Sequence, residues 1–273
     1  MITLKRREQP ISTWQKFSRE VRSKGCNLLA KLGDYPEPVL VTGCQRSGTT
    51  LLARILRQSE GFVDFQTGKD DELDAALILC GHKRFADAGR YCFQTTYVNE
   101  CYHEYFAHKD HVKMIWILRN PYSVVWSMVN NWENFALNEL YHACGEKHHP
   151  KPCKSLFKNI LLPWEDKLTR ACLAYKGKTA QVFDIAERFS PENLLVIEYD
   201  DLIRQSGALL RTVYEFINEP YLESLSGAIH TGSLSKFKSF SPEARAVIEE
   251  HCAEIYAEAR KLMRSSCNQP TEQ

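Results

Sequence analysis

The segment Gly43-Cys-Gln-Arg-Ser-Gly-Thr-Thr50 holds the residues of this chain best suited to bind an anion. It follows the apolar run 38–42 and precedes a helical pattern over residues 51–56, so it is predicted to turn from a strand into a helix. At such a turn, backbone N–H groups and the helix N-terminus face the same point and bind phosphate or sulfate. Arg46 can add two parallel charge-assisted hydrogen bonds.

This segment departs from the phosphate loop of kinases and ATPases at one position. That pattern is G-x-x-x-x-G-K-[ST], and Thr49 stands in the place of its lysine. A kinase without the lysine would lack its main cation for the β- and γ-phosphates, and no strand ending in a clear metal-binding aspartate compensates. An ordinary strand-to-helix turn with a surface arginine is the alternative to an anion site. The anion site is favoured because six suitable residues occur together: Gly43, Arg46, Ser47, Gly48, Thr49 and Thr50.

The stretch 44–52 resembles the 5′-phosphosulfate loop of the sulfotransferases that use 3′-phosphoadenosine 5′-phosphosulfate (PAPS), in the arginine version of the tyrosylprotein and carbohydrate enzymes. The family's second motif is an arginine at a strand end followed eight residues later by a helical serine, and Arg119 and Ser127 match it. The resemblance implies that this pair holds the 3′-phosphate. A helix beginning near Pro121 would place Ser123 and Ser127 on one face and form a second anion pocket.

Two further segments extend the resemblance. The segment 198–202 is similar to the family's Tyr-acid-acid-Leu sequence, which implies that Tyr199 contacts adenine; a tyrosine that merely closes a strand is the alternative. The segment 233–237 resembles the Ser-Lys-aromatic clamp of the tyrosylprotein enzymes, which implies cofactor phosphate contacts by Ser235 and Lys236. A polar loop before a helix is the alternative reading there.

The resemblance also implies where the catalytic base lies. The cytosolic small-molecule enzymes use a histidine after a threonine, and the corresponding segment 93–97 here has none. The arginine-type relatives use a carboxylate shortly after the phosphate-loop helix, where this chain has Asp70, Asp71 and Glu72. We expect Glu72 or Asp71 to be the base, with Asp70 third, and Arg46 to stabilise charge on the leaving phosphate.

Other roles for these residues stay open at this point. The three acids could instead cap a helix over residues 73–79, where negative charge in the first turn is favourable. The reserve bases are His82, His103, His108 and His111, although each residue of this kind is more often a surface or packing histidine.

Three near-continuous apolar runs, 38–42, 112–118 and 193–199, alternate with helical patterns. Such runs predict an α/β fold, a P-loop NTPase-like parallel sheet flanked by helices in a single domain. A last helix is expected from Ser241 to about Met263. The predicted organisation is a basic helical extension at 1–36, packed on the core in preference to a membrane surface, and a sulfotransferase domain at 37–273.

Within that domain, residues 134–163 lose the helical pattern and are predicted to form a surface insertion or lid. The segment contains Cys144, His148, His149 and Cys153, but their spacing matches no four-ligand zinc site, so a polar loop is preferred. Aromatic residues here and nearby could line an acceptor pocket or belong to the core; they are Trp132, Phe135, Tyr141 and Trp164.

Composition narrows the function classes. The 273 residues carry 35 Lys and Arg against 34 Asp and Glu, a net charge of +1, so no global field gathers nucleic acid. No run approaches ~20 apolar residues and no secretory signal follows the N-terminus, which favours a soluble cytoplasmic protein without a transmembrane segment. The ten cysteines are scattered over a long chain, so we expect free thiols.

Together these features predict a sulfotransferase that moves a sulfuryl group from PAPS to a hydroxyl, or an amine, of a small-molecule or carbohydrate acceptor. No metal is expected to be required, and adenosine 3′,5′-bisphosphate (PAP) is the expected product. The rivals are a P-loop kinase or nucleotide-binding protein, which the missing lysine disfavours, and a non-catalytic binding module on the same fold. The sequence predicts neither the acceptor nor the oligomeric state.

Overall fold

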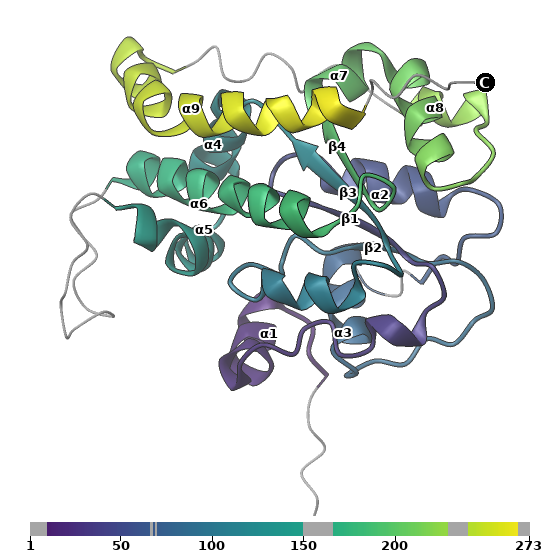
Figure 1. The fold of residues 1–273 in the computed structure, drawn as a ribbon. Helices are drawn as coiled ribbons and strands as arrows, with labels where there is room; N and C mark the ends of the chain where they lie inside the picture. Colours follow the sequence, from purple (N-terminus) through teal and green to yellow (C-terminus); the bar gives the residue numbers. More distant parts are fainter. Residues whose placement is uncertain (1–9, 66–67, 69, 150–165, 229–239, 267–273) are drawn as a thin grey trace, which may run out of the picture.

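The computed structural model describes residues 10–65, 68, 70–149, 166–228 and 240–266 of the chain (Figure 1). Its sheet has four parallel strands in the order β2-β1-β3-β4. The strands are β1 Val39–Gly43, β2 Cys92–Gln94, β3 Lys113–Leu118 and β4 Leu194–Glu198. Three of them confirm the predicted apolar runs to within a residue or two, whereas β2 is too short to give a pattern of its own.

Helices cover both faces of the sheet, which confirms the predicted α/β class. The helices are α1 Trp14–Glu20, α2 Thr49–Arg57, α3 Asp71–Leu79, α4 Pro121–Asn131, α5 Asn134–Leu140, α6 Lys167–Arg188, α7 Tyr199–Arg204, α8 Ser206–Phe216 and α9 Pro242–Ser266. Shorter 3-10 and π-helical turns are η1 Arg22–Lys24, η2 Leu32–Asp34, η3 Tyr102–His108, η4 Tyr141–Gly145, η5 Glu146–His148 and η6 Glu223–Ala228.

Alternate strand residues point into two different cores. Val41 of β1 and Ile115 of β3 pack with the apolar sides of α2 and α8 on one face. Leu40 and Met114, their neighbours in sequence, pack on the other face with α3 and the C-terminal part of α6. Because each strand is buried on both faces, it reads as an unbroken apolar run.

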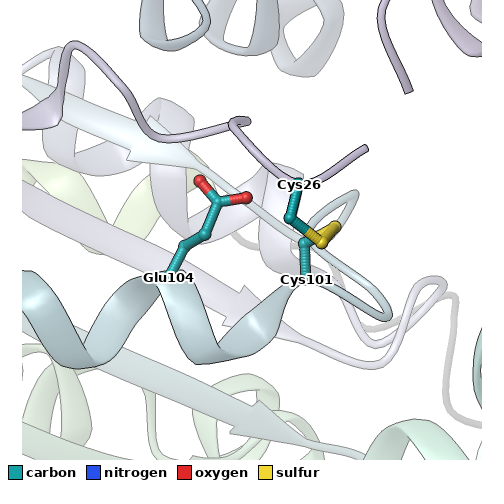
Figure 2. A group of neighbouring side chains, drawn as sticks. All are labelled: Cys26, Cys101 and Glu104. Atoms are coloured by element: carbon teal, nitrogen blue, oxygen red, sulfur yellow. A yellow bond between two sulfur atoms is a disulfide. The ribbon is translucent and has the colours of Figure 1, made fainter. Parts of the chain in front are cut away.

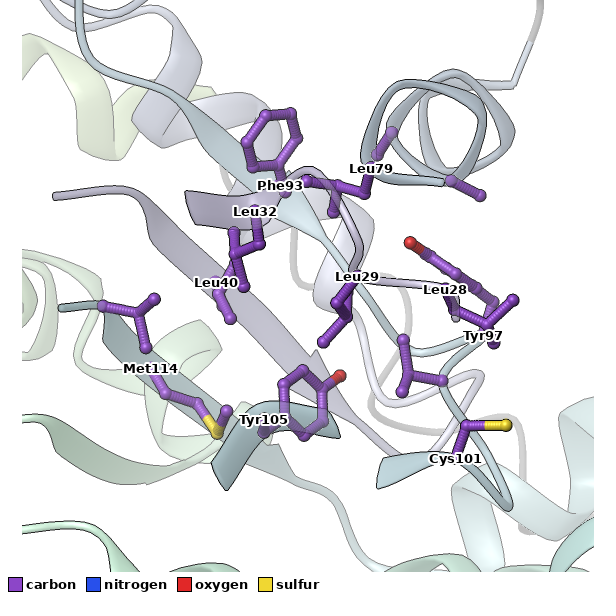
Figure 3. Close-up of a cluster of buried hydrophobic side chains, with 14 of the residues drawn as sticks. Leu28, Leu29, Leu32, Leu40, Leu79, Phe93, Tyr97, Cys101, Tyr105 and Met114 are labelled. Carbon is purple, nitrogen blue, oxygen red and sulfur yellow. The ribbon is translucent and has the colours of Figure 1, made fainter. Parts of the chain in front are cut away.

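The N-terminal segment packs on the second of these cores. Phe17, Leu28, Leu29 and Leu32 are each at most 1% exposed, and they lie against side chains from β1, α3 and the segment after β2 (Figure 3). The structure therefore shows the N-terminal segment packed on the core, which is the alternative that the sequence analysis preferred.

A disulfide joins Cys26 to Cys101, so the expectation of free thiols is wrong for this pair (Figure 2). The nearby Glu104 carboxylate accepts hydrogen bonds from the backbone N–H groups of Leu28 (3.0 Å) and Leu29 (2.8 Å). These contacts bring residues 75 positions apart in sequence to a Cα–Cα distance of 5.3 Å. Glu104 and the two sulfurs cluster tightly enough for a metal, but both sulfurs are consumed in the disulfide. Among the described residues the free cysteines are Cys44, Cys80, Cys92, Cys144, Cys172 and Cys252.

The first half of the predicted surface insertion is a packed helical segment. Residues 134–148 form α5, η4 and η5, and Leu137, Leu140, Tyr141 and Cys144 are buried against α4 and α6. Their spacing of three and four residues is helical, but polar residues between them hid the pattern. The second half of the insertion, with Cys153, lies outside the described residues, as does the nearby Trp164.

Among the described residues, α6 and α9 are the longest helices, and neither they nor any shorter helix could cross a bilayer. The two lie side by side (Figure 1).

We predict that Gly177→Ala destabilises the fold, because α6 crosses η4 at very short range. A Cβ atom at Gly177 would lie 1.9 Å from the backbone carbonyl oxygen of Cys144. The free energy of unfolding should fall by roughly 1–3 kcal/mol, measured by urea denaturation. Gly207→Ala in α8 is the matched control, because the nearest atom to its Cβ lies 3.8 Å away. Equal stability of the two variants would contradict this account.

Candidate active site

The glycine segment forms the predicted strand-to-helix turn between β1 and α2. Gly43 has φ +140 and its Cβ would lie 2.4 Å from the Ile117 carbonyl oxygen. Gly48 has φ +90 and its Cβ would lie 2.1 Å from the ring of Tyr199. Neither position tolerates a side chain. Arg46 between them adopts φ 71, a left-handed conformation that costs a non-glycine residue about 1–2 kcal/mol.

The structure brings the two predicted anion sites together. Arg46 Nε donates to Ser127 Oγ at 2.9 Å, and Arg119 Nη1 donates to the Arg46 carbonyl oxygen at 3.0 Å. The Arg119 guanidinium lies 4.3 Å from the ring centroid of Tyr199. The backbone carbonyl oxygen of Arg119 accepts a hydrogen bond from the Tyr175 hydroxyl at 2.9 Å. Two guanidinium groups are thus fixed beside one loop.

The helix that presents Ser127 begins as predicted. Asn120 caps α4 by accepting from the Ser123 N–H at 2.9 Å, and Pro121 occupies the first turn. Ser123 and Ser127 both line the same cleft. Among the described residues three buried hydroxyls have no hydrogen-bond partner, and besides Tyr97 they are those of Ser47 and Ser123. Buried hydroxyls without partners are rare, and these two lie where an anion is predicted.

A cleft of about 600 Å³ joins these groups to the predicted carboxylates. One side holds residues of the phosphate loop and of the β3–α4 turn, and the other holds the start of α3. Three tryptophans complete the wall: Trp14 of α1, Trp126 of α4 and Trp132 directly after α4. The cleft therefore has room for an anionic group at the loop and for a second molecule beside it.

The structure separates the three candidate carboxylates, beginning with Asp70. This residue is the N-cap of α3, where its Oδ1 accepts from the N–H groups of Glu72 (3.0 Å) and Leu73 (3.1 Å). Its Oδ2 accepts from Trp14 Nε1 at 2.7 Å. Asp70 therefore fixes the start of α3 and ties α1 to it.

Asp71 is held in a buried ion pair. Its side chain is 1% exposed and contacts Arg54 Nε at 2.7 Å and Arg57 Nη2. Burial alone would raise the pKa of Asp71, but the two guanidinium groups hold that pKa below its ordinary value. A carboxylate paired in this way is a poor proton acceptor.

Glu72 has the surroundings of a base. Its carboxylate accepts hydrogen bonds from Gln94 Nε2 (2.9 Å), the Thr96 hydroxyl and the Tyr97 N–H (2.9 Å). Burial raises the pKa of Glu72 to about 7, although the Thr96 and Tyr97 hydrogen bonds oppose this rise. A carboxyl with that pKa can both take and release a proton near neutral pH. Gln94 also donates to Thr49 Oγ1 at 3.1 Å, which joins Glu72 to the phosphate loop.

Other predicted site residues have different surroundings. Tyr199 is 6% exposed and lies beneath the loop, against Gly48 and Arg119. Tyr141 is buried, and Phe135 is at the surface, whereas Trp132 lines the cleft. The four reserve histidines do not line the cleft, and Ser235 and Lys236 lie outside the described residues.

Three functional residues were not predicted from the sequence: Gln94, Thr96 and Tyr97. They belong to the segment 93–97, in which the cytosolic enzymes have a histidine base. The location of this segment therefore pointed to the site, although its residue types did not.

Comparison with known proteins places this geometry in context. A family model described as "Sulfotransferase domain" matches residues 36–267. The sulfotransferase domain from the curacin biosynthetic pathway has a TM-score of 0.53 and 14% identity, covering 83% of this chain and 97% of that chain. At this identity the likeness supports the fold.

Two further structures are similar to a lesser degree. The sulfotransferase domain from the Synechococcus PCC 7002 olefin synthase has a TM-score of 0.48 and 12% identity, covering 87% of this chain and 98% of that chain. A mouse sulfotransferase complexed with PAP has a TM-score of 0.47 and 14% identity, covering 88% of this chain and 94% of that chain. A search of curated proteins finds no significant match.

We predict that the Glu72 carboxyl makes stability pH-dependent. Its folded-state pKa of about 7 lies above the ordinary 4.5, so stability present below pH 4.5 is lost as the pH rises through 7. Urea denaturation from pH 4 to 8 should show the wild type losing stability relative to Glu72→Gln across this window. Glu187→Gln, at an exposed position of α6, is the control. A difference that stays constant with pH would rule out the raised pKa.

Proposed function

Because this chain belongs to the sulfotransferase domain family, we propose that its cleft binds PAPS beside an acceptor and that Glu72 is the base of the transfer. The observation that carries this proposal is the position of Glu72. Its carboxyl, with a pKa of about 7, lines the same cleft as Arg46 and Gly48–Thr50 and is joined to the loop through Gln94.

The residues present fit PAPS. A guanidinium, the partnerless buried hydroxyl of Ser47 and the N-terminus of α2 form an anion cradle at the phosphate loop. We assign the 5′-phosphosulfate to this cradle, which comprises Gly43, Arg46, Ser47, Gly48, Thr49 and Thr50. We assign the 3′-phosphate to Arg119, Ser123 and Ser127. When bound, PAPS supplies the sulfuryl group that is transferred.

Tyr199, Ser235 and Lys236 keep their predicted roles as further cofactor contacts. For Tyr199 the structure supports an additional role. Its ring supports the Arg119 guanidinium from below and fills the space beside Gly48. Tyr199 thus positions one cation of the site whether or not its edge also meets adenine.

In the proposed mechanism Glu72 takes the proton of the acceptor hydroxyl. Roughly half of a carboxyl with pKa about 7 is ionised at neutral pH, so the basic form is available. The Thr96 hydroxyl and the Tyr97 N–H hold the carboxylate in one orientation. Arg46 and the loop amides place positive charge where negative charge develops on the leaving phosphate. Asp71, neutralised by two arginines, is assigned a structural role.

We propose that the acceptor is a hydroxyl-bearing small molecule or carbohydrate. Trp14, Trp126 and Trp132 offer flat apolar surfaces, and Glu139 and Asn131 offer polar groups in the same cleft. Aromatic faces combined with polar edges suit a molecule of that kind. The Cys26–Cys101 disulfide favours an oxidising compartment over the cytoplasmic location expected from the sequence.

We predict that PAP without metal raises the melting temperature of the protein and that Arg46→Ala abolishes this shift. A guanidinium bound to phosphate contributes two charge-assisted hydrogen bonds, and alanine removes both. Arg84→Ala, at an exposed position, is the control. Stabilisation by ATP with Mg²⁺ and not by PAP would favour the kinase alternative.

We predict that Glu72→Gln lowers kcat for sulfuryl transfer by ~10²–10⁴-fold and leaves the PAP-induced melting shift unchanged. Glutamine keeps the shape of the side chain but cannot take a proton. The measurement is transfer of labelled sulfate from PAPS to a panel of hydroxyl compounds, with Glu187→Gln as control. PAP binding by the wild type without turnover of any acceptor would favour the non-catalytic module.

A further inference from the structure

The loop 95–101, called here the base loop, follows β2 and carries the Thr96 and Tyr97 groups that hold Glu72. Five consecutive carbonyl oxygens of this loop each accept a hydrogen bond from a side chain elsewhere in the chain. The pairs are Thr95 with Tyr105 Oη (2.8 Å), Thr96 with Gln45 Nε2 (2.9 Å), Tyr97 with Arg22 Nη2 (2.6 Å), Val98 with Lys178 Nζ (2.9 Å) and Asn99 with Gln181 Nε2 (2.9 Å).

These donors come from the phosphate loop, η1, η3 and α6, so they anchor the base loop from several directions. Figure 3 shows Tyr97 and Tyr105 among the buried side chains of the core. Buried carbonyls need partners, but neutral donors or water would satisfy them. Two of the donors are instead cations.

Lys178 is the more costly of the two cations. Its side chain is 0% exposed, and burial lowers its pKa. Taking an ammonium group out of water is strongly unfavourable, and a single hydrogen bond to a carbonyl does not offset this penalty. Lys178 also contributes a positive charge near Glu72. A cation at this position is explained if its charge stabilises the ionised form of the Glu72 carboxyl.

One peptide group shows how the loop acts on the base. The Thr96 carbonyl accepts from Gln45, and the N–H of the same peptide group donates to Glu72. The next carbonyl, of Tyr97, accepts from Arg22. Because a peptide group is planar, fixing its oxygen fixes the direction of its N–H. The orientation of the Glu72 carboxylate therefore depends on both neighbouring peptide planes.

The N-terminal segment joins this arrangement covalently. Cys26 lies four residues after Arg22, and Cys101 ends the base loop, so the disulfide closes a short path between the arginine and the loop that it holds. Arg22 also contacts Glu100 at 3.6 Å. Without the covalent link, α1 and η1 would be held to the loop by side-chain contacts alone.

We propose, on the basis of the function proposed above, that Lys178 and Arg22 are positioning residues that fix the base loop against Glu72, and that the Cys26–Cys101 disulfide keeps Arg22 in place. The charged or titratable groups that face Glu72 are Asp70 from α3, Lys178 from α6, Tyr97 from the loop and Tyr105 from η3. Lys178 is the cation in this group. Its removal therefore disfavours the charged form of the Glu72 carboxyl.

The first test replaces the two cations. Lys178→Met and Arg22→Met should each lower kcat by ~10–100-fold and leave the PAP-induced melting shift and the KM for PAPS unchanged. The acid limb of the pH–rate profile should move to higher pH, because the Glu72 carboxylate loses stabilisation. Lys176→Met, two residues away on α6 and partly exposed, is the control. Arg22→Lys keeps a cationic donor and should recover most of the kcat.

A second readout does not require activity. The titration of the Glu72 carboxyl, followed by NMR with ¹³C-labelled glutamate and assigned with Glu72→Gln, should shift upward in Lys178→Met. If the wild type transferred no sulfate, the proposed function would fail and this titration would still decide the positioning role. An unchanged titration and an unchanged acid limb in both cation variants would overturn the proposal while sulfuryl transfer by the wild type stood.

The third test concerns the disulfide. A small dithiol reductant gives two electrons and two protons to the Cys26–Cys101 bond, which becomes two thiols, while the dithiol becomes a cyclic disulfide. Wild-type kcat should fall to the level of Arg22→Met on reduction and recover on reoxidation. A Cys26→Ser, Cys101→Ser double variant should show the lower kcat with and without dithiol. Full activity of that double variant would exclude the disulfide from the positioning role.

Discussion

The proposed active site depends on the partly buried carboxyl of Glu72, which is hydrogen-bonded but not neutralised by direct contact with a cation. Asp71 and Glu72 are adjacent in sequence and show the two outcomes. Arginines contact Asp71 directly, and its pKa stays low, whereas Glu72 has only hydrogen-bond donors in direct contact, and burial raises its pKa to about 7. Without the Thr96 and Tyr97 donors the pKa of Glu72 would be higher still, and a paired guanidinium would lower it as the arginines lower that of Asp71. The proposed role of Glu72 as the base requires this intermediate condition, which its hydrogen bonds to the base loop provide.

The strand order explains why these groups meet. In a parallel sheet the segments that follow the carboxyl ends of the strands share one edge. The order β2-β1-β3-β4 places the phosphate loop after β1 between the base loop after β2 and the turn after β3 that carries Arg119. The proposed base, Glu72, which the base loop holds, is therefore on one side of Arg46 and the Arg119 guanidinium on the other. Gln94 and Gln45 link the base side to the loop, and Arg119 links the other side through the Arg46 carbonyl.

Sequence patterns predicted those strands, turns and helix ends that depend on neighbouring residues in the chain. The apolar runs gave β1, β3 and β4, the glycine spacing gave the phosphate loop, and Asn120-Pro121 gave the start of α4. The resemblance to the arginine-type sulfotransferases narrowed the candidate base to three acids. Their partners in the structure then separated them: Trp14 for Asp70 and two arginines of α2 for Asp71. Contacts between distant segments had no local signal. Cys26 and Cys101 are 75 residues apart, and Lys178 and Val98 are 80 apart, so only the folded chain brings them together.

The left-handed backbone of Arg46 connects the two anion sites physically. This conformation is unfavourable for arginine and persists because its carbonyl accepts from Arg119, whose guanidinium lies over Tyr199, whose ring in turn fills the space beside Gly48. Each member of this cycle limits the freedom of the next. Arg46 Nε and Ser127 close it from the side of α4. The Arg119 guanidinium, to which we assign the 3′-phosphate, also holds the backbone of the loop to which we assign the 5′-phosphosulfate. In the proposed function the two ends of PAPS are therefore recognised by one rigid unit whose donors are set in advance.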